Sequence, residues 1–165
     1  MCNKHLRTDK WLENLFQDTY NLYFSDVKKK NPIKVEFGRR AKRRLGSINI
    51  RPSNSSLSVI RVNGWFRHQC VPKNIVQSVI AHELCHYAHG FNSGSDKTQH
   101  KYPHAGGVMK SEFSERGLDK LYEYQCRWIK EQWPKFLQKH YPEPATRPKA
   151  KQKTSVRFIA RLKYF

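Results

Sequence analysis

The sequence predicts an α+β domain in which helices flank a small antiparallel sheet. Two observations support this fold class. Apolar residues recur at helical spacing in three long segments, whereas apolar and polar residues alternate in short segments confined to residues 33–62. The 165 residues are 38% hydrophobic and 13% aromatic, which suits a globular chain with one modest core.

The first half of the chain holds one helix and then the strands. Thr8 can cap a helix that runs to about Lys30, and Pro32 ends it. Alternation then predicts three strands, at residues 33–37, 48–50 and 57–62. Clusters of Gly, Ser, Pro and Asn supply the turns between them. Strands joined in this way favour an antiparallel sheet.

The second half is predicted to be helical. A long apolar helix begins near Pro72, a residue favoured in the first helical turn, and stops at Gly90. A polar loop, residues 91–103, follows it. Helical spacing resumes near Val108 and is strong over residues 118–133.

The composition changes near the C-terminus, after Pro134 has kinked or ended the last helix. Three prolines mark a linker-like stretch, and from Arg147 onward there are seven Lys or Arg and no acid. The predicted organisation is therefore one domain, residues 1–141, followed by a basic tail, residues 142–165.

Charge is the most unusual feature of the composition. Lys and Arg number 32 against 13 Asp and Glu, which gives a formal net charge of +19. Such a positive field attracts polyanions, and nucleic acid is the commonest of these. A basic protein with a solvated surface and no specific partner is the alternative interpretation.

The cysteines and the apolar segments bear on where the protein works. No C-x-x-C pair is present, so a zinc ribbon or a thioredoxin-type site is not expected. Reduced thiols, and with them a cytoplasmic location, are the prediction. No signal peptide is recognisable, and no apolar segment approaches the roughly 18 residues that span a bilayer, so no membrane partner is expected.

The segment His-Glu-Leu-Cys-His, residues 82–86, has the spacing of a metal site. Residues four apart lie on one face of a helix, so His82 and His86 can bind one ion. Zinc lowers the pKa of a bound water toward about 7 and polarises a substrate carbonyl. Glu83 lies beside the first ligand, where its carboxylate can act on that water as a general base. The alternative is an amphipathic helix whose histidines face solvent.

A catalytic zinc needs a third protein ligand and one open position. His104 is the preferred candidate, because it lies in a turn of small residues just before helical character returns. His100 is the nearest rival. Glu112 or Glu115 would give a glutamate ligand, although acids at these positions also suit the N-terminal turn of a helix.

Two runs, VIAHELCHYAHGF and YPHAGGVMKSEFSERGL, make the chain similar to the SprT-like zinc metalloprotease family. The basic segment KVEFGRRAKRRLGSINI also resembles that family, and the similarity covers residues 33–121. It implies a minimal zincin-like fold with a small sheet packed on the active-site helix. It also implies one zinc per chain, bound by His82, His86 and His104, with Glu83 as general base. Better-known members act on proteins bound to DNA. The turn HAGGVM departs from the family's pattern, and the cysteine zinc ribbon of many members is lacking.

Basic residues gather at two places. The densest group, at a turn ahead of the second strand, consists of Arg39, Arg40, Lys42, Arg43 and Arg44. These side chains can grip phosphates, and a solvated turn is the alternative. From Arg157 to the C-terminus, basic and aromatic residues interleave. This mixture can stack bases or pack on the body of the domain.

Several other side chains are assigned to packing. Trp128 and Trp133 are expected in the core, and Cys85 is expected to be a small buried side chain, not a ligand. Trp65 and Phe66 either line a substrate groove or cover the sheet.

The preferred hypothesis is a zinc-dependent metallopeptidase that hydrolyses peptide bonds in nucleic-acid-associated proteins. One rival is a nucleic-acid-binding module with a structural zinc, for which Glu83 would be dispensable. The other is a metal-dependent hydrolase of a non-protein substrate, which would leave proteins whole.

Overall fold

The computed structural model describes residues 6–50, 57–91 and 104–141. The elements follow one another as α1 (Asp9–Tyr23), β1 (Ile33–Phe37), β2 (Gly46–Ile50), β3 (Ser58–Val62), η1 (Gly64–Arg67), α2 (Lys73–Ala88), α3 (Val108–Glu115), α4 (Asp119–Glu131) and α5 (Trp133–His140). The predicted α+β class is thus confirmed. Within these ranges, no helix is long and apolar enough to cross a membrane. The predicted tail, residues 142–165, lies outside the described residues.

Helix α1 begins where the sequence predicts and ends earlier. The Thr8 side chain caps it by accepting a hydrogen bond from the Trp11 amide at 3.1 Å. It stops at Tyr23, not at Lys30. Phe24 leaves helical geometry and is fully buried, so the burial of this ring takes precedence over continuation of the helix.

The sheet is mixed, with the strand order β1-β3-β2. β2 pairs with β3 antiparallel, whereas β1 pairs with β3 parallel. The prediction of an antiparallel sheet is therefore wrong for β1. The reason lies in the composition of β3, where four of the five residues are buried. β3 has apolar residues on the face toward the helices and also a fully buried Val59 on the other face, next to Arg61. A strand buried in this way suits the centre of a sheet, so β3 separates the two strands that precede it.

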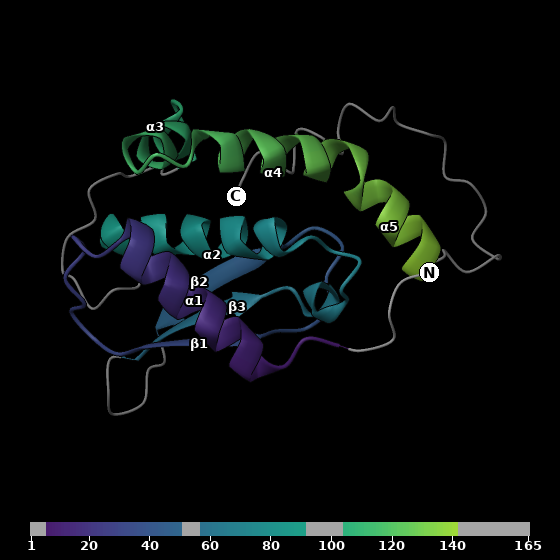
Figure 1. Ribbon diagram of the computed structural model, residues 1–165, viewed down its shortest axis with the longest axis horizontal. Coiled ribbons are helices and arrows are strands. Elements are labelled where there is room, and N and C mark those ends of the chain that lie inside the picture. The colour runs from purple at the N-terminus through teal and green to yellow at the C-terminus, as the bar shows by residue number, and fades with distance from the viewer. Residues whose placement is uncertain (1–5, 51–56, 92–103, 142–165) are drawn as a thin grey trace.

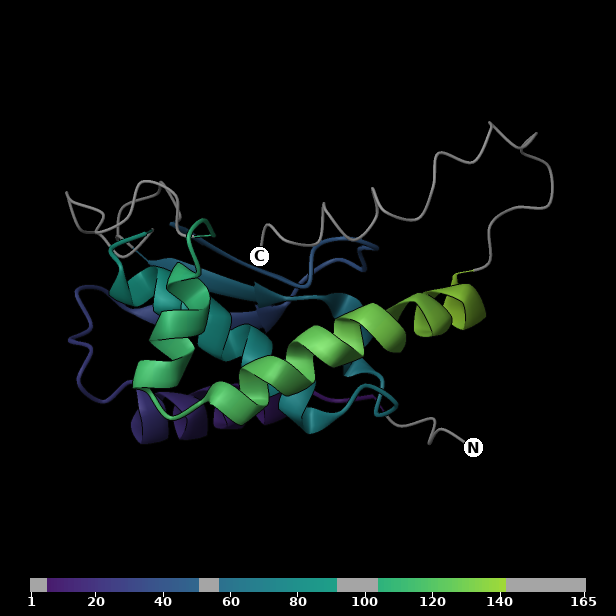
Figure 2. The ribbon, with the colours of Figure 1, turned by 90° about the horizontal axis from the view of Figure 1, so that it is seen from above.

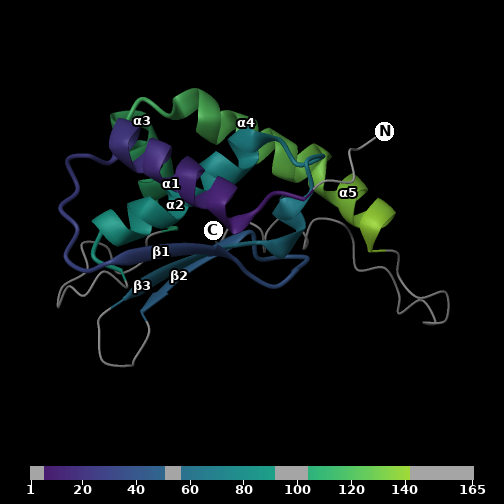
Figure 3. The same cartoon turned by 60° about the horizontal axis from the view of Figure 1, so that its bottom comes forward.

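The helices all lie on one face of the sheet (Figure 1; Figure 3). α1 and α2 pack directly on the strands, and α4 packs on the outer side of α2. Viewed from above, α4 and α5 run along the molecule over this inner layer (Figure 2). Helix α2 consequently has neighbours on every side.

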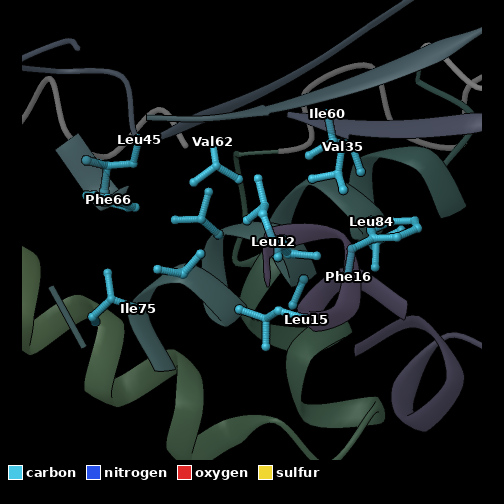
Figure 4. Packing of buried hydrophobic residues seen from close by; sticks show 14 of the residues in the cluster. Leu12, Leu15, Phe16, Val35, Leu45, Ile60, Val62, Phe66, Ile75 and Leu84 are labelled. Atoms are coloured by element: carbon cyan, nitrogen blue, oxygen red, sulfur yellow. The ribbon is translucent and has the colours of Figure 1, made fainter. Parts of the chain in front are cut away.

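The core lies between the sheet and the inner helices (Figure 4). It joins residues such as Leu12 of α1, Ile60 of β3 and Leu84 of α2, each at most 1% exposed. Trp128 and Trp133 are buried as predicted. Trp65 and Phe66 are also buried, so they belong to the core and do not line a groove.

The helices of the second half follow the predicted order. Pro72 caps α2, and Gly90, with φ 89°, follows its C-terminus. α4 ends ahead of Pro134 as predicted. The chain then starts a new helix, α5, with Pro134 in its first turn. Of the described cysteines, Cys85 and Cys126 have free thiols. Cys70 is in a disulfide, so the prediction of reduced thiols is wrong for that residue.

The segment between β1 and β2, residues 38–45, is fixed from within by Asn63. The Asn63 side chain donates to the carbonyls of Ala41 and Arg44, both at 2.7 Å. It accepts from the amides of Ala41 at 3.3 Å and Trp65 at 3.0 Å. Asn63 is 3% exposed. Its side chain therefore holds the segment against the end of β3 through buried hydrogen bonds.

Replacing Asn63 should destabilise the protein. We expect Asn63→Ala to lower the free energy of unfolding by about 2–4 kcal/mol, because several backbone groups lose their partner at once. The matched control, Asn49→Ala on the exposed side of β2, should change it by less than about 0.5 kcal/mol. Urea unfolding measures both, and equal effects would contradict this role.

Candidate metal centre

Helix α2 is the platform of the candidate site. Twelve of its 16 residues are buried, because the sheet, α1 and α4 surround it. In the middle of this apolar helix lie His82, Glu83 and His86, which are 4%, 3% and 8% exposed. Buried polar side chains on such a helix need partners, and these three find them in two different directions.

The histidines face one another. The Nε2 atoms of His82 and His86 lie 3.2 Å apart. His104 reaches the same point from the segment before α3, and its ring centroid lies 5.4 Å from His82 and 4.7 Å from His86. One ligand atom from each of the three lies within 4.8 Å of the others. The structure therefore brings together the three histidines that the sequence singles out.

This arrangement fits a metal ion. Ligand nitrogens around a tetrahedral zinc lie roughly 3.4 Å apart, close to the separation of His82 and His86. Burial, and then the charges of His104 and His89, lower the pKa of His86 to about 3. Burial also lowers the pKa of His82 well below its usual value. Both rings are thus neutral near pH 7 and offer the lone pairs that a metal requires.

Two glycines set the approach of His104. Gly106 and Gly107 have φ angles of 64° and 77°, a left-handed region that L side chains rarely adopt. Gly107 is the N-cap of α3. The chain can therefore reverse just after His104 and enter α3 at once, which leaves the histidine at the entrance of the helix beside α2.

Glu83 points to the sheet. The backbone amide of Ile48 in β2 bonds to its carboxyl group. Burial raises the pKa of Glu83 to about 8, and the charge of Arg44 and the Ile48 amide oppose that rise. The carboxyl group is not in the cluster of three ligand residues. It is a buried acid that exchanges its proton near neutral pH, next to the cluster in sequence.

Two of the three alternative third ligands, Glu112 and Glu115, bond to other side chains. Glu112 bonds to His89 at 2.8 Å and to Arg116 at 2.7 Å, so its carboxylate is engaged away from the cluster. Glu115 accepts a hydrogen bond from Ser111 on an exposed helix face. His100 lies outside the described residues.

Sequence reasoning missed the network around Arg116. Its guanidinium bonds to Glu112, to the Tyr23 carbonyl and to Asp26. Because Glu112 also bonds to His89, the network joins the ends of α1 and α2 to α3. The spacing of Glu112 and Arg116, four residues apart on one helix, is the available signal. Such pairs are common on exposed helices, however, and do not by themselves predict a buried network.

The predicted basic group lies on the segment between β1 and β2. Arg39, Arg40 and Arg44 line a hollow of about 830 Å³, together with Arg61 of β3. Arg40 also lies over the Trp65 ring at 4.4 Å. Lys42 lies over the Tyr141 ring at 4.2 Å, and Arg43 is exposed. The hollow is also lined by Gly46, Ser47 and Asn49 of β2, so it borders the strand against which Glu83 lies. Ser47 and Asn49 alternate with Gly46 and Ile48, and they therefore belong to the face of β2 turned away from Glu83.

The raised pKa of Glu83 predicts a pH dependence of stability. A carboxyl whose pKa rises from 4.5 to about 8 on folding adds stability below pH 4.5 and loses it as the pH rises to about 8. In metal-free protein, the free energy of unfolding of wild type should therefore fall relative to that of Glu83→Gln over this range. The histidines are present in both proteins and cancel. A constant difference, measured by urea unfolding in chelator, would contradict the assignment.

Comparison with known proteins adds no family to this geometry. No family model matches the chain, and neither a curated protein nor a solved structure matches it.

Proposed function

We propose that the protein is a zinc metallopeptidase with a minimal zincin-like fold, as the resemblance to the SprT-like family implies. One observation carries the proposal. Within the described parts of the chain, one ligand atom from each of three histidines lies within 4.8 Å of the others, and the adjacent acid, Glu83, is buried but stands outside that ligand group. A structural zinc site usually closes with four protein ligands, whereas a catalytic site keeps three and one open position.

The donor set supports zinc. Imidazole nitrogen suits zinc, copper, iron and nickel. Among the residues that the structure describes, three histidines form the group, which matches the ligand number of a hydrolytic zinc, because such a site keeps one position open for water or substrate. The ions would be told apart by elemental analysis of the purified protein.

The reaction assigns separate tasks to the residues. When bound, zinc supplies a Lewis acid and lowers the pKa of a water molecule. His82, His86 and His104 hold the ion. Glu83 accepts the proton of the attacking water and gives it to the leaving amine. To accept that proton the carboxyl group must be ionised, and the positive charge of a bound zinc would lower its pKa from the value of about 8 in the metal-free protein.

The basic hollow supports a substrate class. Arg39, Arg40 and Arg44 offer guanidinium groups that bind phosphates, and the net charge of +19 attracts nucleic acid from a distance. The hollow and Glu83 both adjoin Gly46 of β2, so a nucleic acid bound in the hollow would hold its associated proteins on the molecule that carries the metal centre. We therefore propose nucleic-acid-associated proteins as substrates.

Zinc content and proteolysis test the central proposal. Wild type should contain one zinc per chain and cleave casein or a DNA-bound protein, and chelator should abolish cleavage. His104→Ala should lose zinc, whereas His100→Ala should retain it. Glu83→Gln should keep the zinc and lower kcat by roughly 10²–10⁴-fold, because only the general base is lost.

Other outcomes would favour the rival hypotheses. Full function of Glu83→Gln, with one zinc bound, would point to a structural zinc in a nucleic-acid-binding module. Turnover of a small ester while casein and DNA-bound proteins stay whole would point to a hydrolase of a non-protein substrate. Absence of zinc from wild type would refute the metallopeptidase.

The basic hollow can be tested separately. The triple variant Arg39→Ser/Arg40→Ser/Arg44→Ser should bind a 20-nucleotide single strand more weakly. The slope of log K against log salt should fall by about 2, because roughly 0.7 counterions are released per phosphate contact. The control Lys10→Ser/Lys120→Ser/Lys130→Ser removes the same charge from exposed positions on α1 and α4. An equal loss in both triples would mean that net charge, and not this hollow, binds nucleic acid.

A further inference from the structure

Strand β2 approaches the candidate general base at a glycine. Gly46, the first residue of β2, is buried, and its face of the strand is turned to α2. A Cβ atom added there would lie 2.6 Å from Oε1 of Glu83 and 2.6 Å from Cγ1 of Val79. Carbon atoms do not approach other atoms this closely, so one of these side chains would have to move.

The same strand also holds the carboxyl group. Two residues further along β2, Ile48 bonds through its backbone amide to Glu83. Gly46 and Ile48 are both buried, and alternate residues of a strand share one face. Gly46 thus leaves a space and Ile48 supplies a hydrogen-bond donor, so β2 surrounds the end of the Glu83 side chain.

Space, and not backbone conformation, explains this glycine. Gly46 is not among the glycines with positive φ, so other residues can adopt its backbone geometry. Glycine inside a strand is otherwise unfavourable, because it packs nothing and adds freedom to the unfolded chain. Its presence where β2 meets Glu83 is therefore best explained by the close approach of the carboxyl group.

We propose that Gly46 is a positioning residue for Glu83. Its missing side chain leaves the slot in which the carboxyl group lies, and the slot sets the direction in which Glu83 exchanges a proton. This inference rests on the proposed function in so far as it concerns catalysis. The contact itself does not depend on zinc or on substrate.

The first experiment compares Gly46→Ala with Gly38→Ala. Gly38 is a matched control, because a Cβ there would meet Cβ of Arg61 at 3.4 Å, an ordinary contact. Both variants should bind one zinc per chain. The probe is a fluorescence-quenched peptide with a casein sequence. Gly46→Ala should lower its kcat by about 10²-fold and change its KM by less than about threefold, as expected when a general base is displaced. Gly38→Ala should leave both close to wild type.

A second variant separates catalysis from packing. In Gly46→Ala/Val79→Ala the clash with the valine is gone, and only the contact with Glu83 remains. The difference in Tm between this double variant and Val79→Ala should be smaller than the difference in Tm between Gly46→Ala and wild type. The kcat of the double variant should nevertheless stay low. Recovery of kcat would overturn the inference, since general packing would then explain the loss.

Melting of the metal-free proteins tests the contact without any activity. Gly46→Ala should lower the Tm of wild type by about 4 °C or more. In a Val79→Ala/Glu83→Ala background, the same substitution should cost no more than Gly38→Ala costs in wild type. An unchanged loss in that background would refute the assigned contacts.

The two proposals can fail separately. A wild type without zinc or peptidase activity would refute the proposed function, and the melting comparison would still decide whether Gly46 makes room for Glu83. An active wild type in which Gly46→Ala matches Gly38→Ala in kcat would refute the positioning role alone.

Discussion

Helix α2 is buried at 12 of its 16 residues although it carries two histidines and a glutamate at its centre, and the rest of the structure depends on how these polar side chains are neutralised or bonded. Charged groups in such a place are costly unless they are neutralised or bonded. The histidines are kept neutral by their surroundings, and the carboxyl group takes an amide from β2. The sheet, α1 and α4 then enclose the helix with apolar residues, each of which stabilises the fold by about 1.5–3 kcal/mol when fully buried.

The features that could be predicted from sequence depend on neighbours in the chain. The cap of α1 at Thr8, the start of α2 after Pro72 and the convergence of His82 with His86 follow from spacing and local chemistry. The features that could not be predicted depend on distant partners. The strand order needs the burial of β3 on both faces, and the role of Asn63 needs a segment some 20 residues away to fold back on it.

The basic hollow combines rigidity with charge. The segment of residues 38–45 carries the arginines of the hollow, and it is held at one end of the sheet by Asn63 and by the Trp133 indole, which donates to the Lys42 carbonyl at 2.9 Å. A basic segment fixed in this way presents its guanidinium groups at set positions. Pre-organised donors of this kind lose less conformational entropy when an anion binds. The same sheet end thus contacts both Glu83 and the segment that carries these arginines.

The mixed sheet also combines a local pairing with a distant one. β2 and β3 form a local hairpin, whereas β1 pairs with β3 at a separation of 25 residues, from Ile33 to Ser58. α1 packs on β1, but β1 has no strand partner until β3 is in place, because parallel pairing requires a distant partner. An unpaired strand invites association with other chains, and charged side chains discourage it. Lys34 and Glu36 alternate with the apolar residues of β1. The apolar residues can therefore pack in the core while the charged residues discourage association with other chains.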